Sequence, residues 1–260
     1  MQNKNGLQDA PQKVRDLLDK ILSSLKEIFA DDLVGMYLHG SLVQGCFHPK
    51  QSDIDFTVVV KNPLTQEQEK QLFQLHENIR KDSDYGEWFE GIFFTLDQVK
   101  KAVFPSPFLF CFAHSKCRVP KDEKDRDPDF PMTLRHLYDY GVALFGPEPK
   151  KLFLPPEWKI LESSIKEDVQ YSFKIFQEAP LYTVLNLCRA IYALETKDVS
   201  ASKQQAGEWG LQNFPAEFKS LIKTALEAYQ HGLTDEQKQF LLENLDQFIA
   251  YCKEKIAKIS

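Results

Sequence analysis

Hydrophobic residues recur with two different periods along the first part of the chain. Over residues 11–29 they are spaced three and four apart, which is the period of an amphipathic helix. Two short, mostly apolar runs follow, Leu33–Leu38 and Ile54–Val60, and both have the length and composition of buried strands. Thr65 then opens a capping-box pattern, which predicts a helix that ends near residue 81.

The alternation of helices and strands stops where prolines crowd the chain. A third strand is predicted at Glu87–Phe94, and a second capping-box pattern, at Thr95, starts another helix. The prolines between residues 147 and 156 then indicate a domain boundary. We therefore expect an α+β fold, with a mixed domain at residues 1–154 and an all-helical domain at residues 155–260. The expected helices of the second domain are residues 159–176, 181–194, 203–212, 217–231 and 235–259.

The composition and charge narrow the class of ligand. Apolar residues make up 43% of the chain and aromatic residues 12%, which excludes a disordered protein. The net charge is −6 and no basic cluster occurs, so we expect a cationic small molecule as ligand and no nucleic acid. The N-terminal sequence has no signal-peptide or membrane-spanning pattern, and the five cysteines are scattered. We therefore expect a cytoplasmic monomer with reduced thiols and no membrane association.

Four residues, at the end of the first predicted strand and at the start of the second, point to phosphate and metal chemistry. Gly40 and Ser41 end the first strand, where a glycine lets backbone N–H groups and the serine hydroxyl approach phosphate oxygens. Asp53 and Asp55 open the next strand, whose period of two directs both carboxylates to one side. Such a pair is unfavourable without a cation, and Mg²⁺ is the hard ion that carboxylates prefer. The alternative is an ordinary turn beside two solvated aspartates.

Glu90 is a third acidic candidate, because it lies inside the apolar run Trp88–Phe94. A carboxylate within a buried strand is costly unless it faces a cation or water. We therefore expect Glu90 to face the same cation as the two aspartates. The alternative is a carboxylate on a solvated face at the edge of the strand.

Together these residues resemble the signature of the nucleotidyltransferase superfamily with a polymerase-beta-like palm. That signature is a Gly-Ser turn after one strand and Asp-x-Asp on the next. The resemblance implies that Gly40 and Ser41 bind the phosphates of ATP. It also implies that Asp53, Asp55 and Glu90 are catalytic and hold two Mg²⁺ ions, with Glu90 as general base or metal ligand.

The helical half is similar to the C-terminal domain of the streptomycin/spectinomycin adenylyltransferases. In that family an arginine, a lysine and a tyrosine reach the nucleotide, and ATP and the drug lie between the two domains. By motif position these residues are Arg189, Lys203 and Tyr229. The alternatives are an internal salt bridge for the arginine, a surface lysine and a core aromatic ring. The similarity is carried by Leu185–Tyr192, Ser202–Lys203, Glu208–Trp209, Phe214–Ala216, Ala228–Tyr229 and, before them, Val142–Gly146.

Two departures from that family concern the acceptor. The tryptophan that contacts the drug has no counterpart in residues 112–115, where His114 is the polar candidate. The drug-binding aspartate falls on Ala179, and Glu178 is the nearest acid. We therefore name Glu178 and His114 as candidate acceptor contacts. A zinc site formed by Cys111, His114 and Cys117 is an alternative use of that histidine, although the surrounding sequence favours buried packing.

We therefore expect Mg²⁺-dependent transfer of an adenylyl group from ATP to a hydroxyl of an aminoglycoside-like molecule, with release of pyrophosphate. Such an enzyme would confer antibiotic resistance. Two other functions stay open. One is a nucleotide-binding regulatory or antitoxin-type module, which the complete carboxylate set disfavours. The other is a nucleotidyltransferase that acts on a protein or another non-antibiotic acceptor.

Overall fold

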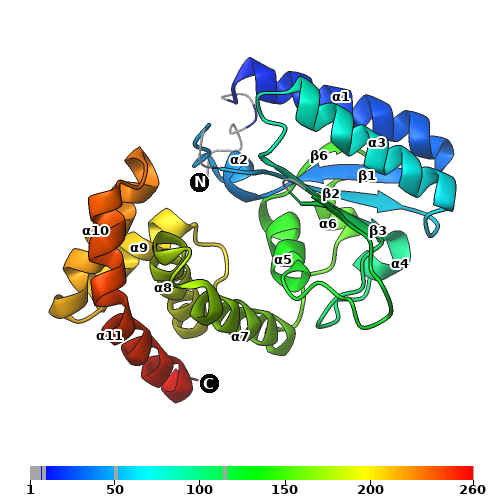
Figure 1. Cartoon of the computed structure of the whole chain (residues 1–260). Helices are drawn as coiled ribbons and strands as arrows, with labels where there is room; N and C mark the ends of the chain where they lie inside the picture. The colour runs from blue at the N-terminus through cyan, green and yellow to red at the C-terminus, as the bar shows by residue number, and fades with distance from the viewer. Residues whose placement is uncertain (1–6, 8–9, 50–51, 114–115, 260) are drawn as a thin grey trace. The chain divides into compact units, whose positions relative to one another are not determined.

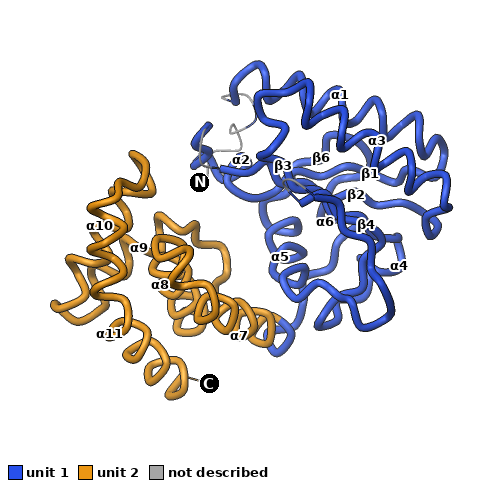
Figure 2. Tube along the Cα trace, in the orientation of Figure 1, with its two compact units in different colours: residues 1–160 blue, residues 161–260 orange. Residues whose placement is uncertain are grey.

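The computed structural model describes residues 7, 10–49, 52–113 and 116–259. The chain divides into two compact units, residues 1–160 and 161–260, which Figure 2 distinguishes by colour. All the described strands belong to the first unit, and the described part of the second unit is helical. The expected α+β class with a helical C-terminal part is therefore confirmed.

The first unit is built on a six-stranded sheet with the strand order β5-β4-β3-β2-β1-β6. Strands β2 and β3 are parallel, and the other neighbouring pairs are antiparallel. A parallel pair needs a crossover connection, which α3 (Gln66–Asp82) provides. The strands are β1 (Leu33–Leu38), β2 (Ile54–Val60), β3 (Phe89–Thr95), β4 (Phe110–Ala113), β5 (Lys116–Arg118) and β6 (Val142–Phe145).

Helices cover both faces of this sheet. In Figure 1, α1 (Gln12–Phe29) and α3 lie over one face, and α5 (Phe130–Tyr140) lies over the other. One hydrophobic cluster includes Phe56 and Phe93 with residues of α1 and α3, and a second includes Val59 with residues of α5. Because strand residues alternate between faces, Asp55 is on the α5 face, as Val59 is. The short helices are α2 (Gly40–Gln44), α4 (Leu96–Val99) and α6 (Pro149–Leu152).

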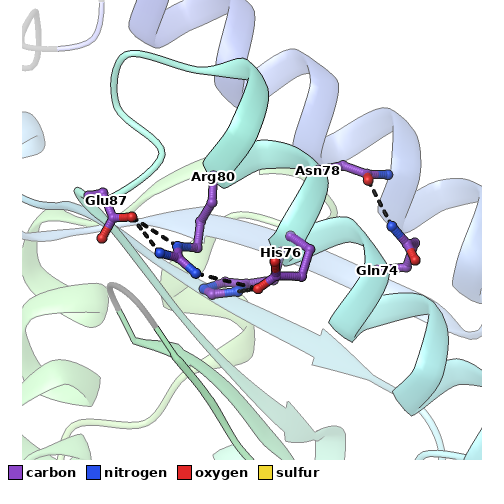
Figure 3. Close-up of polar contacts among 6 residues, drawn as sticks. Gln74, His76, Asn78, Arg80 and Glu87 are labelled. Carbon is purple, nitrogen blue, oxygen red and sulfur yellow. Dashed lines mark hydrogen bonds and ion pairs between the residues drawn. The ribbon is translucent and has the colours of Figure 1, made fainter.

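Helix α3 is fixed at both ends. At its start, Thr65 Oγ1 accepts from the backbone N–H of Gln68 at 3.2 Å, and Gln68 Oε1 accepts from the N–H of Thr65 at 2.9 Å. The predicted capping box is therefore confirmed. At its other end, Arg80 donates two hydrogen bonds to Glu87 Oε1, at 3.0 and 2.6 Å (Figure 3). This ion pair ties α3 to the turn that precedes β3, the strand that carries Glu90.

The second unit packs around α8 (Pro180–Thr196), which is buried along much of its length and contacts the other four α-helices described in this unit. Predicted and observed helix ends agree closely in this unit, because its helices are long enough to show their period. The other helices are α7 (Trp158–Ile175), α9 (Lys203–Asn213), α10 (Lys219–His231) and α11 (Asp235–Ile259). None of the described helices of either unit combines the length and apolar character needed to cross a lipid bilayer.

The sequence pattern misses β4, β5, α5 and β6 of the first unit, and also the short helices α2 and α6. Strands β4 and β5 have only four and three residues, too few for a period to be recognised. The hairpin that β4 and β5 form also shows whether Cys111 and Cys117 could bind one zinc ion. Cys111 packs in the cluster on the α5 face and Cys117 in the cluster on the opposite face. The two thiols therefore cannot share a zinc ion, and buried packing is the correct interpretation.

Candidate active site

The turn after β1 presents the first group of candidate residues. His39 is extended, Gly40 has a φ of +67°, and α2 begins at this point. The hydroxyl of Ser41 is buried and has no hydrogen-bond partner among the described residues. A buried hydroxyl without a partner is destabilising, so a ligand oxygen that paired with it would stabilise both groups.

The Asp55 carboxylate lies directly against this turn. A Cβ atom at Gly40 would be 2.0 Å from Asp55 Oδ2, so only a glycine leaves room for the carboxylate. Asp55 also pairs in register with Glu90 of β3, which makes the two acids neighbours on the face that α5 covers. Asp53 immediately precedes β2 and, like the other two acids, is partly exposed. The structure thus brings the Gly-Ser turn and the acidic candidates to one region of the sheet.

The carboxylate oxygens of these acids are ligands of the type that Mg²⁺ prefers. Mg²⁺ is usually held by one or two carboxylates, with water and substrate phosphates as its other ligands. In the described part of the chain, no three His, Cys, Asp or Glu side chains are gathered closely enough to form a metal site by themselves. The neighbouring Asp55 and Glu90 with Asp53 nearby supply carboxylate oxygens, and nucleotide phosphates would complete the coordination. The residues therefore fit a metal that binds together with its nucleotide.

His39 belongs to this region, although the sequence pattern assigns it no role. Its ring Nε2 lies 3.2 Å from Oγ1 of Thr57, a fully buried residue of β2. Burial lowers the pKa of His39 to about 3, and His136 on α5 contributes to the same shift. The imidazole is therefore neutral at physiological pH. One of its ring nitrogens is then a donor and the other an acceptor.

In the helical unit, Arg189 is engaged by an acid of the same unit. Its Nη2 atom lies 3.3 Å from Asp168 Oδ2 and donates to Asn186 Oδ1 at 2.7 Å. The Asp168 side chain is only 9% exposed, whereas that of Arg189 is 24% exposed. The internal salt bridge considered as an alternative is therefore present. The guanidinium has five N–H donors, so this pairing leaves others for an anion.

Lys203 belongs to the same polar group of residues. Its ammonium lies 4.5 Å from the centroid of the Tyr182 ring, which is a cation–π distance. The Tyr182 hydroxyl in turn donates to Asp168 Oδ1 at 3.1 Å. Asp168 therefore connects Arg189 on α8 with the tyrosine that supports Lys203 on α9. Two residues predicted to bind the nucleotide are thus held in one network.

The remaining candidates are more scattered. Tyr229 lies on α10 and is partly buried. Glu178 is exposed in the turn between α7 and α8. His114 lies outside the described residues. The structure therefore places Tyr229 and Glu178 in the helical unit.

Asp168 is the residue that sequence reasoning overlooks. A signal for it exists, because it falls on the buried stripe of α7 with Ile165, Val169 and Ser172. An acid at such a position needs a partner of opposite charge or a set of hydrogen bonds. Its actual partner lies 21 residues further along the chain, and no helical period relates two residues that far apart.

Comparisons with known proteins match both units. A family model described as the aminoglycoside adenylyltransferase C-terminal domain matches residues 151–255, and a nucleotidyltransferase domain model matches residues 18–88. Spectinomycin 9-adenylyltransferase from Staphylococcus aureus is 24% identical, over 94% of this chain and 95% of that protein. Aminoglycoside (3'') (9) adenylyltransferase from Escherichia coli is 21% identical, over 95% of this chain and 96% of that protein.

A solved structure has the same fold. It is that of a spectinomycin adenyltransferase from Enterococcus faecalis with ATP and spectinomycin, at a TM-score of 0.80 and 20% sequence identity. The match covers 94% of this chain and 99% of that one. With a nucleotidyltransferase domain model matched in the first part of the chain and an adenylyltransferase C-terminal domain model matched in the second, the chain is similar over nearly its whole length to the spectinomycin and aminoglycoside adenylyltransferases.

Proposed function

We propose that this protein transfers an adenylyl group from ATP to a hydroxyl of an aminoglycoside-like antibiotic and releases pyrophosphate. The observation that carries the proposal is the pairing of Asp55 with Glu90 beside the turn that holds Gly40 and Ser41. This arrangement places acidic side chains next to groups suited to phosphate oxygens. Full-length similarity to enzymes named for spectinomycin and aminoglycoside adenylylation supports the choice of acceptor.

The chemistry assigns a different task to each part of this region. The acceptor hydroxyl oxygen attacks the α-phosphorus, the bond from that phosphorus to the bridging oxygen breaks, and pyrophosphate leaves. Glu90 takes the proton of the attacking hydroxyl as general base. The Ser41 hydroxyl and the backbone of the turn hold the phosphates that leave. Most of the catalysis then comes from positioning and from electrostatic stabilisation.

The remaining proposed roles belong to the metal ligands and to residues of the helical unit. Asp53 and Asp55 would hold two Mg²⁺ ions, which when bound would supply Lewis-acid stabilisation of the phosphate charge. Arg189 and Lys203 offset phosphate charge, and Tyr229 contacts the nucleotide. Glu178 and His114 are the proposed contacts of the acceptor. Carboxylates near the acceptor suit its ammonium groups.

A direct assay tests this function. The purified chain is incubated with Mg-ATP and a panel of acceptors that contains spectinomycin, streptomycin, a further aminoglycoside and neutral sugars. Pyrophosphate release is followed, and mass spectrometry detects the added adenylyl group on the acceptor. We expect adenylylation of at least one cationic antibiotic, and an Asp55→Asn variant measured in parallel should be inactive.

Two results would contradict the proposal. If no member of the panel gains an adenylyl group while a protein acceptor is labelled, the acceptor class is wrong. If ATP binds but no acceptor of either kind is modified, the chain is a nucleotide-binding module and not a transferase. A thermal unfolding curve of the Asp55→Asn variant shows whether its loss of activity reflects the site or the fold.

A further inference from the structure

His39 forms hydrogen bonds with two residues of the strand that carries Asp55. Its backbone N–H donates to the carbonyl oxygen of Asp55 at 3.1 Å. Its ring Nε2 lies 3.2 Å from the hydroxyl of Thr57. We call this set of contacts the His39 staple. It joins the last residue before the Gly40–Ser41 turn to β2 through both the main chain and the side chain.

The staple determines where the turn lies relative to the Asp55 carboxylate. Gly40 directly follows His39, and the space where its Cβ would be is occupied by Asp55 Oδ2. The next residue, Ser41, carries the buried hydroxyl that has no hydrogen-bond partner in the described part of the chain. A small shift of His39 along β2 would therefore change the spacing between the groups assigned to phosphate and those assigned to metal.

Thr57 is well suited to its part in the staple. It is fully buried and lies two positions beyond Asp55, on the same face of β2. Its hydroxyl therefore has no access to water, and the imidazole of His39 supplies its hydrogen bond. A buried hydroxyl paired with a neutral imidazole is directional, so it restricts the ring to one orientation.

We propose that His39 is a positioning residue, which holds the phosphate-binding turn at a fixed distance from the strand of the metal-binding carboxylates. The inference rests on the proposed function, and it adds a residue that aligns the phosphate-binding turn with the metal-binding carboxylates. A misplacement of reacting groups by about 1 Å can reduce turnover about 100-fold while most binding contacts remain. Loss of the staple should therefore reduce kcat more than it raises the KM for ATP.

The experiment uses substitutions on both sides of the hydrogen bond, in the full-length chain. Thr57→Val removes the hydroxyl at nearly constant volume, and Thr57→Ser keeps it. His39→Phe removes both ring nitrogens, and His39→Gln places an amide near the position of Nε2. We expect Thr57→Val and His39→Phe each to reduce kcat about 10- to 100-fold, with the KM for ATP changed by less than about threefold. Thr57→Ser should stay within about twofold of the wild type.

The pairing itself is tested by the double variant. If the two side chains act through each other, His39→Phe combined with Thr57→Val should reduce kcat no further than the stronger single variant. His39→Gln should recover part of the activity lost in His39→Phe. Additive losses, or equal kcat values for Thr57→Val and Thr57→Ser, would overturn the proposal. Thermal unfolding curves confirm that the compared variants are folded.

A measurement without turnover separates this inference from the proposed function. Hydrogen–deuterium exchange of the peptide around Gly40 and Ser41, in the absence of ligands, should be at least about tenfold faster in Thr57→Val than in Thr57→Ser. If exchange responds as expected but the wild type modifies no acceptor, the proposed function fails and the staple stands. If the wild type is active and exchange and kcat are unchanged in Thr57→Val, the staple fails and the proposed function stands.

Discussion

At the scale of single residues, the close contact of Gly40 with Asp55 is the most sensitive point of the candidate site. A methyl group at Gly40 would meet Oδ2 of Asp55 at 2.0 Å, whereas one at Gly45 would have open space around it. Both glycines have positive φ values, +67° and +73°, so an alanine at either position carries a similar backbone cost of about 1 kcal/mol. Comparing the alanine variants at Gly40 and Gly45 therefore distinguishes the cost of backbone strain from the effect of a collision with the Asp55 carboxylate.

We predict that Gly40→Ala abolishes measurable turnover, whereas Gly45→Ala lowers stability by about 1 kcal/mol and leaves turnover within about threefold. Urea denaturation and steady-state rates of the two variants provide the comparison. Equal turnover in both variants would show that the Asp55 carboxylate does not need its observed position. The assignment of this residue to the metal would then fail.

A second prediction at this scale separates the base from the metal ligands. Glu90→Gln should reduce kcat by about 10²-fold or more while Mg-ATP binds with nearly unchanged affinity, because the amide cannot accept the proton. Asp55→Asn should reduce turnover by about 10³-fold or more and weaken Mg-ATP binding as well. Calorimetric titration with a non-hydrolysable ATP analogue measures affinity in both variants. If both lose affinity equally, Glu90 is a ligand and not the base.

At the scale of helices and strands, sequence reasoning succeeds where a local signal exists. The Thr65 capping box and the long helices of the second unit follow from residues within one or two turns of each other. The β4–β5 hairpin is too short to show a period. The pairing of Asp55 with Glu90 depends on strand register, and the partnership of Asp168 with Arg189 depends on helix packing. Neither of these relations is encoded in residue spacing.

The network on α7, α8 and α9 gives a prediction at this scale. Asp168→Ala should lower the free energy of unfolding by about 1–3 kcal/mol, because it leaves the partly buried Arg189 without its carboxylate and Tyr182 without its acceptor. It should also raise the KM for ATP, since Arg189 loses its orientation. The matched control is Lys166→Gln on the same helix, which removes an exposed ion pair to Glu162.

For Lys166→Gln we expect the free energy of unfolding to change by less than about 0.5 kcal/mol and the KM for ATP to stay unaltered. Urea denaturation and initial rates at varied ATP concentrations measure both quantities. A KM unchanged in Asp168→Ala, despite the loss of stability, would mean that Arg189 serves the fold of the helical unit and does not contact the nucleotide.

At the scale of the whole molecule, the excess of acidic residues should act on the acceptor. The chain carries 38 acidic and 32 basic residues, a net charge of −6. Long-range attraction of a polycationic drug is screened by salt, since the Debye length falls to about 8 Å at physiological ionic strength. We predict that the KM of a polycationic acceptor rises severalfold between about 0.03 and 0.3 M salt.

A neutral or singly charged acceptor used by the same enzyme is the control, and its KM should change by less than about twofold over that range. Initial rates at saturating Mg-ATP give both values. Glu178→Gln should reduce the salt dependence for the polycation if this exposed acid contributes to binding. Parallel salt curves for the two acceptors would show that charge attraction plays no part in recognition.

The parallel pairing of β2 and β3 through α3 also affects how such a gene can change by recombination. Asp53, Asp55 and Glu90 are encoded within a single short stretch, together with the helix that fixes the spacing of the two strands. An exchange of DNA downstream of this stretch would replace the helical unit, including Glu178, and leave the carboxylates and their support intact. The carboxylate set is therefore inherited as one block, and an incoming helical unit has to supply both the acceptor contacts and the nucleotide contacts proposed for Arg189, Lys203 and Tyr229.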